Sequence, residues 1–247
     1  MKAIILAAGY ATKLYPLTKD KPKPLLEVKG KTILDMIIEK INLLQAINEI
    51  LIVTNNKFFE NFLRWQRNLL GKVGKAKKKI KILNDCTKNE KERLGAIGDL
   101  AFVLKKEKRD DDFLVISGDN LFSFNLQGIY KDFSEKKEPV VGLYDVKSKE
   151  EARKFGIVSL DKNNRIMDFE EKPPIPESTL ASIGIYFYPK TIIKKIFQYL
   201  EEGNKKDAPG FFLEWLYKKQ DVYGYIFSGR WFDIGSIESL KKAESYF

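Results

Sequence analysis

The first 26 residues place a run of small side chains shortly before a conformationally restricted lysine. An apolar segment ends in Ala7, Ala8 and Gly9, where a ligand can lie against the backbone and successive N–H groups can bind an anion. Lys13 follows, and Lys23 stands between two prolines that restrict the backbone around it. Small residues followed by two ammonium groups are suited to binding a polyphosphate, so we expect this segment to hold a nucleoside triphosphate.

Carboxylates suited to a hard metal ion stand much later in the chain. Asp119 ends the apolar run "VISGDN", and Asp233 lies in "RWFDIGS". Carboxylate oxygens are the ligands that Mg²⁺ prefers in proteins. A third cluster, "FEEKP", carries Glu170, Glu171 and Lys172 at a strand end. Each piece by itself is also typical of a turn, a helix cap or a salt-bridged strand end, and it is their joint order that favours a catalytic site.

The composition excludes several kinds of chemistry. The chain has 247 residues with no histidine and one cysteine, Cys86, which excludes Ser-His-Asp and Cys-His catalysis, His-containing zinc sites and an intrachain disulfide. The net charge of +10 suits phosphate-rich ligands and would also suit nucleic acid or an anionic membrane. The densest basic cluster, 71–81, has no interleaved aromatic residues, so we interpret it as a solvated loop and expect no nucleic-acid partner.

Alternating strand and helix patterns organise the first half of the chain. Strands are predicted at 2–7, 49–55, 80–85 and 112–120, and helices at 31–46, 57–71 and 95–108, with Thr32 as an N-cap. This alternation predicts an α/β fold with a doubly wound, mainly parallel, Rossmann-like sheet and helices on both faces. The ends of parallel strands are where ligands bind in such sheets, and the small-residue loop and Asp119 fall there.

The second half of the chain has a different pattern of predicted strands and helices. Strands are predicted at 139–146, 181–189 and 222–229, a hairpin at 156–173, and helices at 191–203, at 210–220 and from near Ser236, which is predicted to cap the last helix. We interpret these elements as additions to the same sheet that form a β-rich lid, within a single domain over 1–247. No apolar stretch approaches the ~18–20 residues that span a bilayer, and the N-terminus lacks the pattern of a signal peptide, so we expect a cytoplasmic protein without a membrane partner.

Taken in order, these motifs resemble those of the sugar-1-phosphate nucleotidylyltransferases, such as the glucose-1-phosphate thymidylyl- and uridylyltransferases. The matching segments are "LAAGYATKLYPLTKDKPKPLLEV", "RLGAIGDL" (93–100), "GDN" (118–120), "FGIV" (155–158), "EEKP" (170–173) and "WFDIGS" (231–236). The resemblance covers the whole chain. It implies a nucleotide-binding half at roughly 1–125 and a sugar-binding half at 126–247, and a reaction in which a sugar 1-phosphate attacks the α-phosphate of a nucleoside triphosphate and releases pyrophosphate.

The resemblance also implies the roles of individual residues. Catalysis is assigned to Lys13, Lys23 and Asp119, and Mg²⁺ binding to Asp119 and Asp233. Nucleotide binding is assigned to Leu6, Ala7, Ala8, Gly9, Lys13, Lys23, Gly95 and Asp119. Binding of the sugar phosphate is assigned to Gly156, Glu171 and Lys172.

Two positions depart from the family pattern Gly-x-Gly-Thr-Arg. Lys13 keeps the charge of the usual arginine without its bidentate fork, and Ala11 replaces a glycine, which is harmless only if φ is negative there.

The sequence leaves several alternative substrates and functions open. Family frequency favours glucose 1-phosphate with dTTP or UTP. A cytidylyltransferase for phosphocholine or an inositol phosphate is an alternative, as is a homologue that senses nucleotide or sugar without turnover. The chain shows no hexapeptide repeat, so we expect no C-terminal β-helix, and a homo-oligomer is possible because many relatives self-associate.

Overall fold

The parallel part of the sheet is built from the most apolar strands of the chain. In the computed structural model, which describes residues 1–70, 78–108 and 110–247, β1 (Lys2–Leu6) pairs in parallel with β4 (Glu49–Thr54) and β6 (Phe113–Ser117). β5 (Lys79–Asn84) extends this part on the far side of β4. All six residues of β4 are buried, as expected for a parallel strand covered on both faces.

Antiparallel pairing begins at β11 (Leu180–Tyr188). This long strand pairs with β6, with β8 (Val140–Asp145) and with β9 (Gly156–Leu160). β10 (Ile166–Glu171) closes the hairpin with β9, and β12 (Tyr223–Ile226) runs parallel to β8. The later strands therefore extend the first half's sheet into one mixed sheet of nine strands among the described residues, and the predicted fold class is confirmed.

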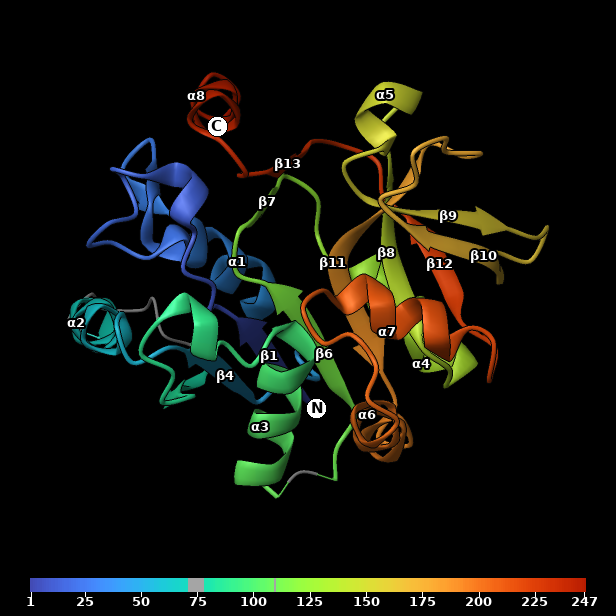
Figure 1. Cartoon of the computed structure of the whole chain (residues 1–247), viewed down its shortest axis with the longest axis horizontal. Helices are drawn as coiled ribbons and strands as arrows, with labels where there is room; N and C mark the ends of the chain where they lie inside the picture. The colour runs from blue at the N-terminus through green and yellow to red at the C-terminus, as the bar shows by residue number, and fades with distance from the viewer. Residues whose placement is uncertain (71–77, 109) are drawn as a thin grey trace.

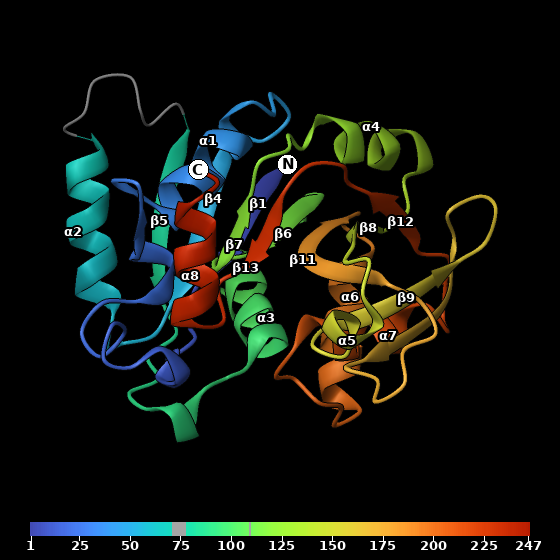
Figure 2. The same ribbon diagram turned by 90° about the horizontal axis from the view of Figure 1, so that it is seen from above.

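Helices cover both faces of this sheet, as Figure 1 and Figure 2 show. One apolar cluster packs α1 (Ile33–Asn42), α2 (Phe59–Leu70), α4 (Gln127–Lys136) and α8 (Ile237–Glu244) on one face. A second cluster packs α3 (Ala96–Lys106), α6 (Ile192–Glu201) and α7 (Pro209–Leu216) on the other. The short α5 (Lys149–Ala152) precedes the β9–β10 hairpin. None of the helices in the described ranges is long and apolar enough to cross a membrane.

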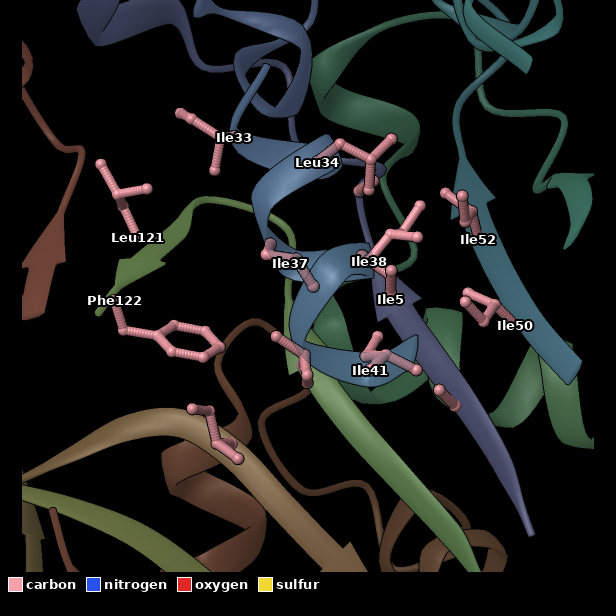
Figure 3. Packing of buried hydrophobic residues seen from close by; sticks show 14 of the residues in the cluster. Ile5, Ile33, Leu34, Ile37, Ile38, Ile41, Ile50, Ile52, Leu121 and Phe122 are labelled. Atoms are coloured by element: carbon pink, nitrogen blue, oxygen red, sulfur yellow. The ribbon is translucent and has the colours of Figure 1, made fainter. Parts of the chain in front are cut away.

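Helix α1 illustrates how local sequence sets an element. The Thr32 hydroxyl accepts a hydrogen bond from the Asp35 amide, and the Asp35 side chain accepts one from Thr32, which completes a capping box. The buried residues of α1 face β1 and β4 in Figure 3, where Ile38 lies beside Ile5. The predicted N-cap is confirmed, whereas the helix ends at Asn42, four residues before its predicted end.

Two short strands carry the chain from the main sheet to the site. The predicted strand 112–120 ends at Ser117, because the chain turns at Gly118 and Asp119 after a last hydrogen bond from the Gly118 amide to the carbonyl of Leu6. β7 (Asn120–Phe122) leaves this turn and pairs antiparallel with β13 (Trp231–Asp233). A second small pair joins β2 (Glu27–Val28) to β3 (Lys31–Thr32).

Other differences from the sequence predictions are local. Helix α4 was not predicted, although Ile129 and Phe133 form a buried stripe at helical spacing. The predicted end of the second helix, Gly71, and most of the basic segment 71–81 lie outside the described residues. The last helix begins after Ser236, whose hydroxyl accepts from the Ser239 amide as predicted for a cap.

Candidate active site

The loop after β1 leaves open space against the backbone. Ala7 donates its amide to the carbonyl of Val53, and the buried Asn55 side chain donates to the carbonyl of Ala8 at 2.9 Å, so the loop is fixed from beneath. A Cβ placed on Gly9 would meet nothing within 4 Å. The loop therefore presents backbone groups toward an open cavity, as its small residues predict.

This cavity has a volume of about 310 Å³, and we call it the nucleotide cavity after the role that the sequence analysis predicts for several of its lining residues. Its lining residues come from the end of β1 and the loop after it, the Lys23–Leu25 turn, the end of β6, the start of α3 with the residues before it, and the segment before α7: Leu6, Ala7, Ala8, Gly9, Ala11, Lys23, Pro24, Arg93, Gly95, Ala96, Asp99, Ser117, Asp119 and Asp207. All the residues that the sequence assigned to the nucleotide are among them except Lys13, which is exposed and lies outside the lining.

Close packing at the wall of the nucleotide cavity requires a glycine at position 95. Its φ is +80°, and a Cβ there would lie 2.5 Å from the carbonyl oxygen of Lys206. That carbonyl and the carbonyl of Asp207 accept hydrogen bonds from the amides of Ile97 and Ala96. The first turn of α3 is thereby joined to the segment before α7.

Ala11 adopts the left-handed conformation, with φ +49° and ψ +38°. Its carbonyl accepts hydrogen bonds from the Thr18 hydroxyl, at 2.7 Å, and from the Leu14 amide. A non-glycine residue in this region is strained by about 1 kcal/mol or more. A glycine, which the family pattern has at this position, would avoid the strain. The alanine of this chain therefore lowers the free energy of unfolding relative to glycine.

Lys23 forms an ion pair with Asp119 at the edge of the nucleotide cavity. Lys23, which stands between Pro22 and Pro24, is the first residue of a short 3₁₀ turn, Lys23–Leu25. Its Nζ lies 2.6 Å from Oδ2 of Asp119. The lysine side chain is 15% exposed and the aspartate 34%, so the carboxylate keeps access to a ligand. Burial alone would lower the pKa of Lys23, but Asp119 and Asp233 outweigh it and raise that pKa.

The β7–β13 pair brings Asp233 to Asp119. Asp233 lies directly opposite Asn120, the residue after Asp119, in the antiparallel register. Burial and then the charge of Asp119 raise the pKa of Asp233, while Lys23 and Lys172 lower it. Two carboxylates that the sequence separates therefore share one electrostatic environment beside the Lys23 ammonium.

A second cavity, of about 250 Å³, meets the first at Ser117 and Asp119. We call it the sugar cavity after the role that the sequence analysis predicts for Gly156, Glu171 and Lys172. Its lining adds residues from the antiparallel strands and the segment leading into α7, many of them polar or aromatic: Asn120, Lys154, Phe155, Gly156, Glu171, Lys172, Ser182, Ile183, Gly184, Tyr186, Ala208, Pro209, Gly210, Trp231 and Asp233. The predicted Gly156, Glu171 and Lys172 all lie here.

Two glycines make room for the Glu171 carboxylate. A Cβ on Gly156 would lie 2.8 Å from Oε2 of Glu171, and one on Gly210 would overlap the same oxygen. Burial raises the pKa of Glu171, and the nearby Lys172, whose Nζ is 3.8 Å from Oε1, opposes that rise. Lys172 itself has φ +55°, a strained conformation of the kind that clusters at ligand sites.

Other lining residues were not assigned by the sequence analysis. The buried Asn120 side chain donates to the carbonyls of Ile183 and Gly184 and accepts from the Trp231 indole at 2.8 Å, so it orients the aromatic wall of the sugar cavity. Its position in "GDN" is the only signal that the sequence offered. Arg93 pairs with Asp207 at 3.0 Å across the nucleotide cavity, and that pair joins segments more than 100 residues apart.

A pair of buried carboxyl groups supports the wall of the nucleotide cavity. Burial and the neighbouring Asp85 raise the pKa of Asp99 to about 8, so the pair holds a proton at neutral pH. Asp85 also accepts from the Thr87 amide and hydroxyl, and the Thr87 hydroxyl lies 3.2 Å from that of Tyr10 in the loop after β1. This chain of contacts joins α3 to the loop.

The donor set beside Lys23 suits a magnesium ion. Asp119 and Asp233 supply hard oxygen ligands. Burial first, and then the charge of Asp119, raises the pKa of Asp233, and a bound cation would offset both effects. Among the described residues no cluster of three or more Asp, Glu, His or Cys side chains is placed to hold a metal. Two carboxylates would leave the remaining coordination positions of the ion to water and substrate phosphates, which is a common arrangement for Mg²⁺ in proteins.

Comparison with known proteins identifies the family. A family model described as nucleotidyl transferase matches residues 2–246. The chain belongs to this nucleotidyl transferase family. It is 32% identical over 248 residues to the bifunctional protein GlmU of Methanocaldococcus jannaschii and 30% identical over 254 residues to that of Methanococcus aeolicus. The match covers all of this chain and 54% of each relative, so the chain spans about half the length of the curated relatives it matches.

Solved structures of the family share the fold. A structure described as a glucose-1-phosphate thymidylyltransferase from Bacillus anthracis superposes with a TM-score of 0.82 at 26% identity, covering 99% of this chain and 94% of that one. The UTP-bound UDP-glucose pyrophosphorylase of Acinetobacter baumannii superposes with a TM-score of 0.79 at 20% identity, covering 99% and 92%. The resemblance that the motifs indicated is thus confirmed at the level of the family.

Proposed function

We propose that the protein is a Mg²⁺-dependent sugar-1-phosphate nucleotidylyltransferase that makes a nucleoside diphosphate sugar and pyrophosphate. The observation that carries this proposal is the junction of the two cavities. They meet at Ser117 and Asp119, with Lys23 and Asp233 beside them. A reaction that joins two phosphorylated substrates needs one site for each and charge neutralisation where they meet.

In this reaction the phosphate oxygen of the sugar 1-phosphate attacks the α-phosphorus of the nucleoside triphosphate. The new P–O bond forms in line with the bond that breaks, and pyrophosphate leaves with the electron pair. No covalent intermediate with the protein is required, which agrees with a chain that has no histidine.

The chain's own residues have distinct tasks in this mechanism. The Lys23 ammonium, held by Asp119 at the junction, neutralises charge on the α-phosphate. The amides of the Ala8–Gly9 loop bind phosphate oxygens. The outer phosphates are assigned to the exposed Lys13 on the sequence resemblance alone. Asp119 and Asp233 would hold the magnesium ion, which supplies electrostatic stabilisation of the phosphates and the leaving group when it is bound.

The sugar side of the reaction is assigned to the second cavity. The Glu171 carboxylate accepts hydrogen bonds from sugar hydroxyls, and the Lys172 ammonium binds the sugar phosphate. We propose glucose 1-phosphate with dTTP or UTP as the substrate pair. The support is the sequence resemblance together with the likeness to a chain described as a glucose-1-phosphate thymidylyltransferase.

Pyrophosphate release from purified protein with Mg²⁺ tests this proposal. A panel pairs dTTP, UTP, CTP, ATP and GTP with the 1-phosphates of glucose, mannose, galactose and N-acetylglucosamine. We expect turnover with glucose 1-phosphate and a pyrimidine nucleotide that is lost when EDTA removes the metal. Wells with CTP and phosphocholine or inositol 1-phosphate test the cytidylyltransferase alternative, since Phe155, Tyr186 and Trp231 offer aromatic rings in the second cavity. Nucleotide binding without turnover in any well would favour a sensor.

A further inference from the structure

A third cavity, of about 470 Å³, lies along α6, α7 and the segment between them. We call it the lysine–aromatic cavity. It is lined by Tyr199, Asn204, Lys205, Phe211, Glu214, Trp215, Lys218 and Lys219. None of these residues lines the nucleotide cavity or the sugar cavity within the part of the chain that the structure describes, so the proposed reaction makes no use of it.

The aromatic wall of this cavity is held in a fixed orientation. The Trp215 indole N–H donates to Oε2 of Glu202 at 2.7 Å, and Tyr199 packs edge-on against the indole with the ring centroids 5.6 Å apart. Phe212 lies parallel beneath it, with the centroids 5.9 Å apart. The Tyr199 hydroxyl donates to the carbonyl of Lys205, which ties the wall to the segment before α7.

Ammonium groups surround these rings. The Nζ of Lys219 lies 5.0 Å from the centroid of Trp215, and that of Lys205 lies 5.0 Å from the centroid of Phe211. Neither ammonium has a carboxylate within 4.0 Å among the described residues. Lys218 is 3.9 Å from Glu214, the acidic group of the lining.

The negative charge nearest to the rings is already engaged. Glu202 accepts hydrogen bonds from the side chains of Trp215, Gln198 and Asn204, at 2.7, 2.9 and 3.3 Å. These hydrogen bonds, and to a smaller extent the charge of Lys219, lower the pKa of Glu202. What the cavity still offers is flat apolar ring surface together with the ammonium groups of Lys205 and Lys219, neither of which forms an ion pair within 4.0 Å among the described residues.

The same segment of chain borders all three cavities. Asn204 and Lys205 line the lysine–aromatic cavity, Asp207 lines the nucleotide cavity and Ala208 lines the sugar cavity. The carbonyls of Lys206 and Asp207 accept the amides of Ile97 and Ala96 at the start of α3, at 3.0 and 3.4 Å. Lys205 in the lysine–aromatic cavity is therefore only two residues from Asp207 at the wall of the nucleotide cavity.

We propose that the lysine–aromatic cavity binds a small planar anion, and that its occupancy is transmitted through residues 204–207 to the nucleotide cavity. The ring of the ligand lies against Trp215 and Phe211, and its anionic group is bound by Lys205 and Lys219 as they move from the ring faces. The ligand class is an aromatic ring that carries a phosphate, sulfonate or carboxylate.

Titration with anilinonaphthalene sulfonate, a planar aromatic anion, tests binding. The double variant Lys205→Gln/Lys219→Gln removes the two ammonium groups, and Lys162→Gln/Lys194→Gln removes equal charge from exposed positions outside the cavity. We expect saturable binding by the unmodified chain and the control, and affinity lowered about fivefold or more in the first variant. Equal affinity in all three proteins, or no saturable binding to the unmodified chain, would overturn the site.

Hydrogen exchange tests transmission without reference to catalysis. In the unmodified chain the probe should change the exchange of the peptide that contains the Ala96 and Ile97 amides by about threefold or more, because those amides bond to Asp207 and Lys206. The Lys205→Gln/Lys219→Gln variant should show no such change at the same probe concentration. Unchanged exchange in the unmodified chain, with the probe bound, would overturn transmission. Both results stand apart from the proposed reaction, since neither requires turnover.

Discussion

The nucleotide cavity and the sugar cavity are built by different means. The first lies at the carboxyl ends of parallel strands and is lined largely by small residues, such as Ala8, Gly9 and Ala96, that expose the backbone. The second is lined by longer side chains from antiparallel strands, including Glu171, Tyr186 and Trp231. Parallel strands are followed by loops to helices, so their ends offer N–H groups, whereas antiparallel strands offer alternating side chains.

Under the proposed function, the first cavity would recognise groups that all nucleotides share, and the second would distinguish one sugar from another. Backbone amides bind phosphates in any nucleotide, while side chains that accept or exclude hydroxyl groups distinguish sugars. Asp119 belongs to both cavities, so changes there should affect both substrates, and changes elsewhere should affect one.

The largest expected effect is at the junction. Asp119→Ala and Asp233→Ala should each lower kcat/KM by ~10²-fold or more, because each removes a proposed ligand of the magnesium ion whose charge would stabilise the transferring phosphate. Pyrophosphate release with the best substrate pair measures the loss. Asp221→Ala, which changes an exposed aspartate paired with Arg165, serves as the control and should keep the wild-type rate. A near-normal rate in either junction variant would remove that aspartate from the metal site.

The second effect concerns the wall of the nucleotide cavity. The pKa of Asp99 is raised to about 8 in the folded chain, from the ordinary value of 3.8 expected when unfolded. The folded state therefore binds the extra proton between these values, and the free energy of unfolding should fall as pH rises from about 4 to about 8 and then level off. Asp99→Asn should lose this slope and be more stable than the unmodified chain at pH 9 by about 2 kcal/mol.

Urea unfolding at pH 5, 6, 7, 8 and 9 measures both slopes. Asp221→Asn is a matched control that should retain the slope of the unmodified chain. If Asp99→Asn follows the same curve as the unmodified chain, Asp99 does not hold a proton in the folded state.

A third test separates the two cavities. Glu171→Gln should raise KM for the sugar 1-phosphate about tenfold and leave KM for the nucleotide within about twofold, because a charged acceptor is lost from one cavity only. Steady-state kinetics with each substrate varied in turn provide the measurement. Glu170→Gln is the neighbouring control, since successive side chains of β10 point to opposite faces and Glu170 is exposed. An equal rise in both KM values would mean that Glu171 is not confined to sugar recognition.

The smallest effect lies in the loop after β1. Ala11→Gly should raise the free energy of unfolding by about 0.5–1 kcal/mol, because glycine adopts φ +49° without strain. Ala101→Gly, in the interior of α3, should change it in the opposite direction. Urea unfolding of both variants gives the comparison, and a loss of stability in Ala11→Gly would show that the alanine methyl makes a contact worth more than the strain.

Local sequence was enough for much of the site. The apolar strand and small-residue loop, the proline-flanked Lys23, the Thr32 and Ser236 caps and the alternation of the first half all follow from interactions within a few residues, and the structure has each of them. Missing from the sequence predictions were helix α4, the early end of β6 and the left-handed Ala11, because each depends on what packs against the segment.

The positions of the charged residues, and of the loops small enough to approach a phosphate, can be read from the amino-acid sequence. Three contacts at the site depend on long-range packing: Asp233 lies opposite Asn120, the Glu171 carboxylate lies against Gly156 and Gly210, and Asp99 lies beside Asp85. The two kinds of feature depend on interactions of different range. Propensity and capping act over one or two turns, whereas strand pairing between distant segments is selected by the burial of the whole sheet.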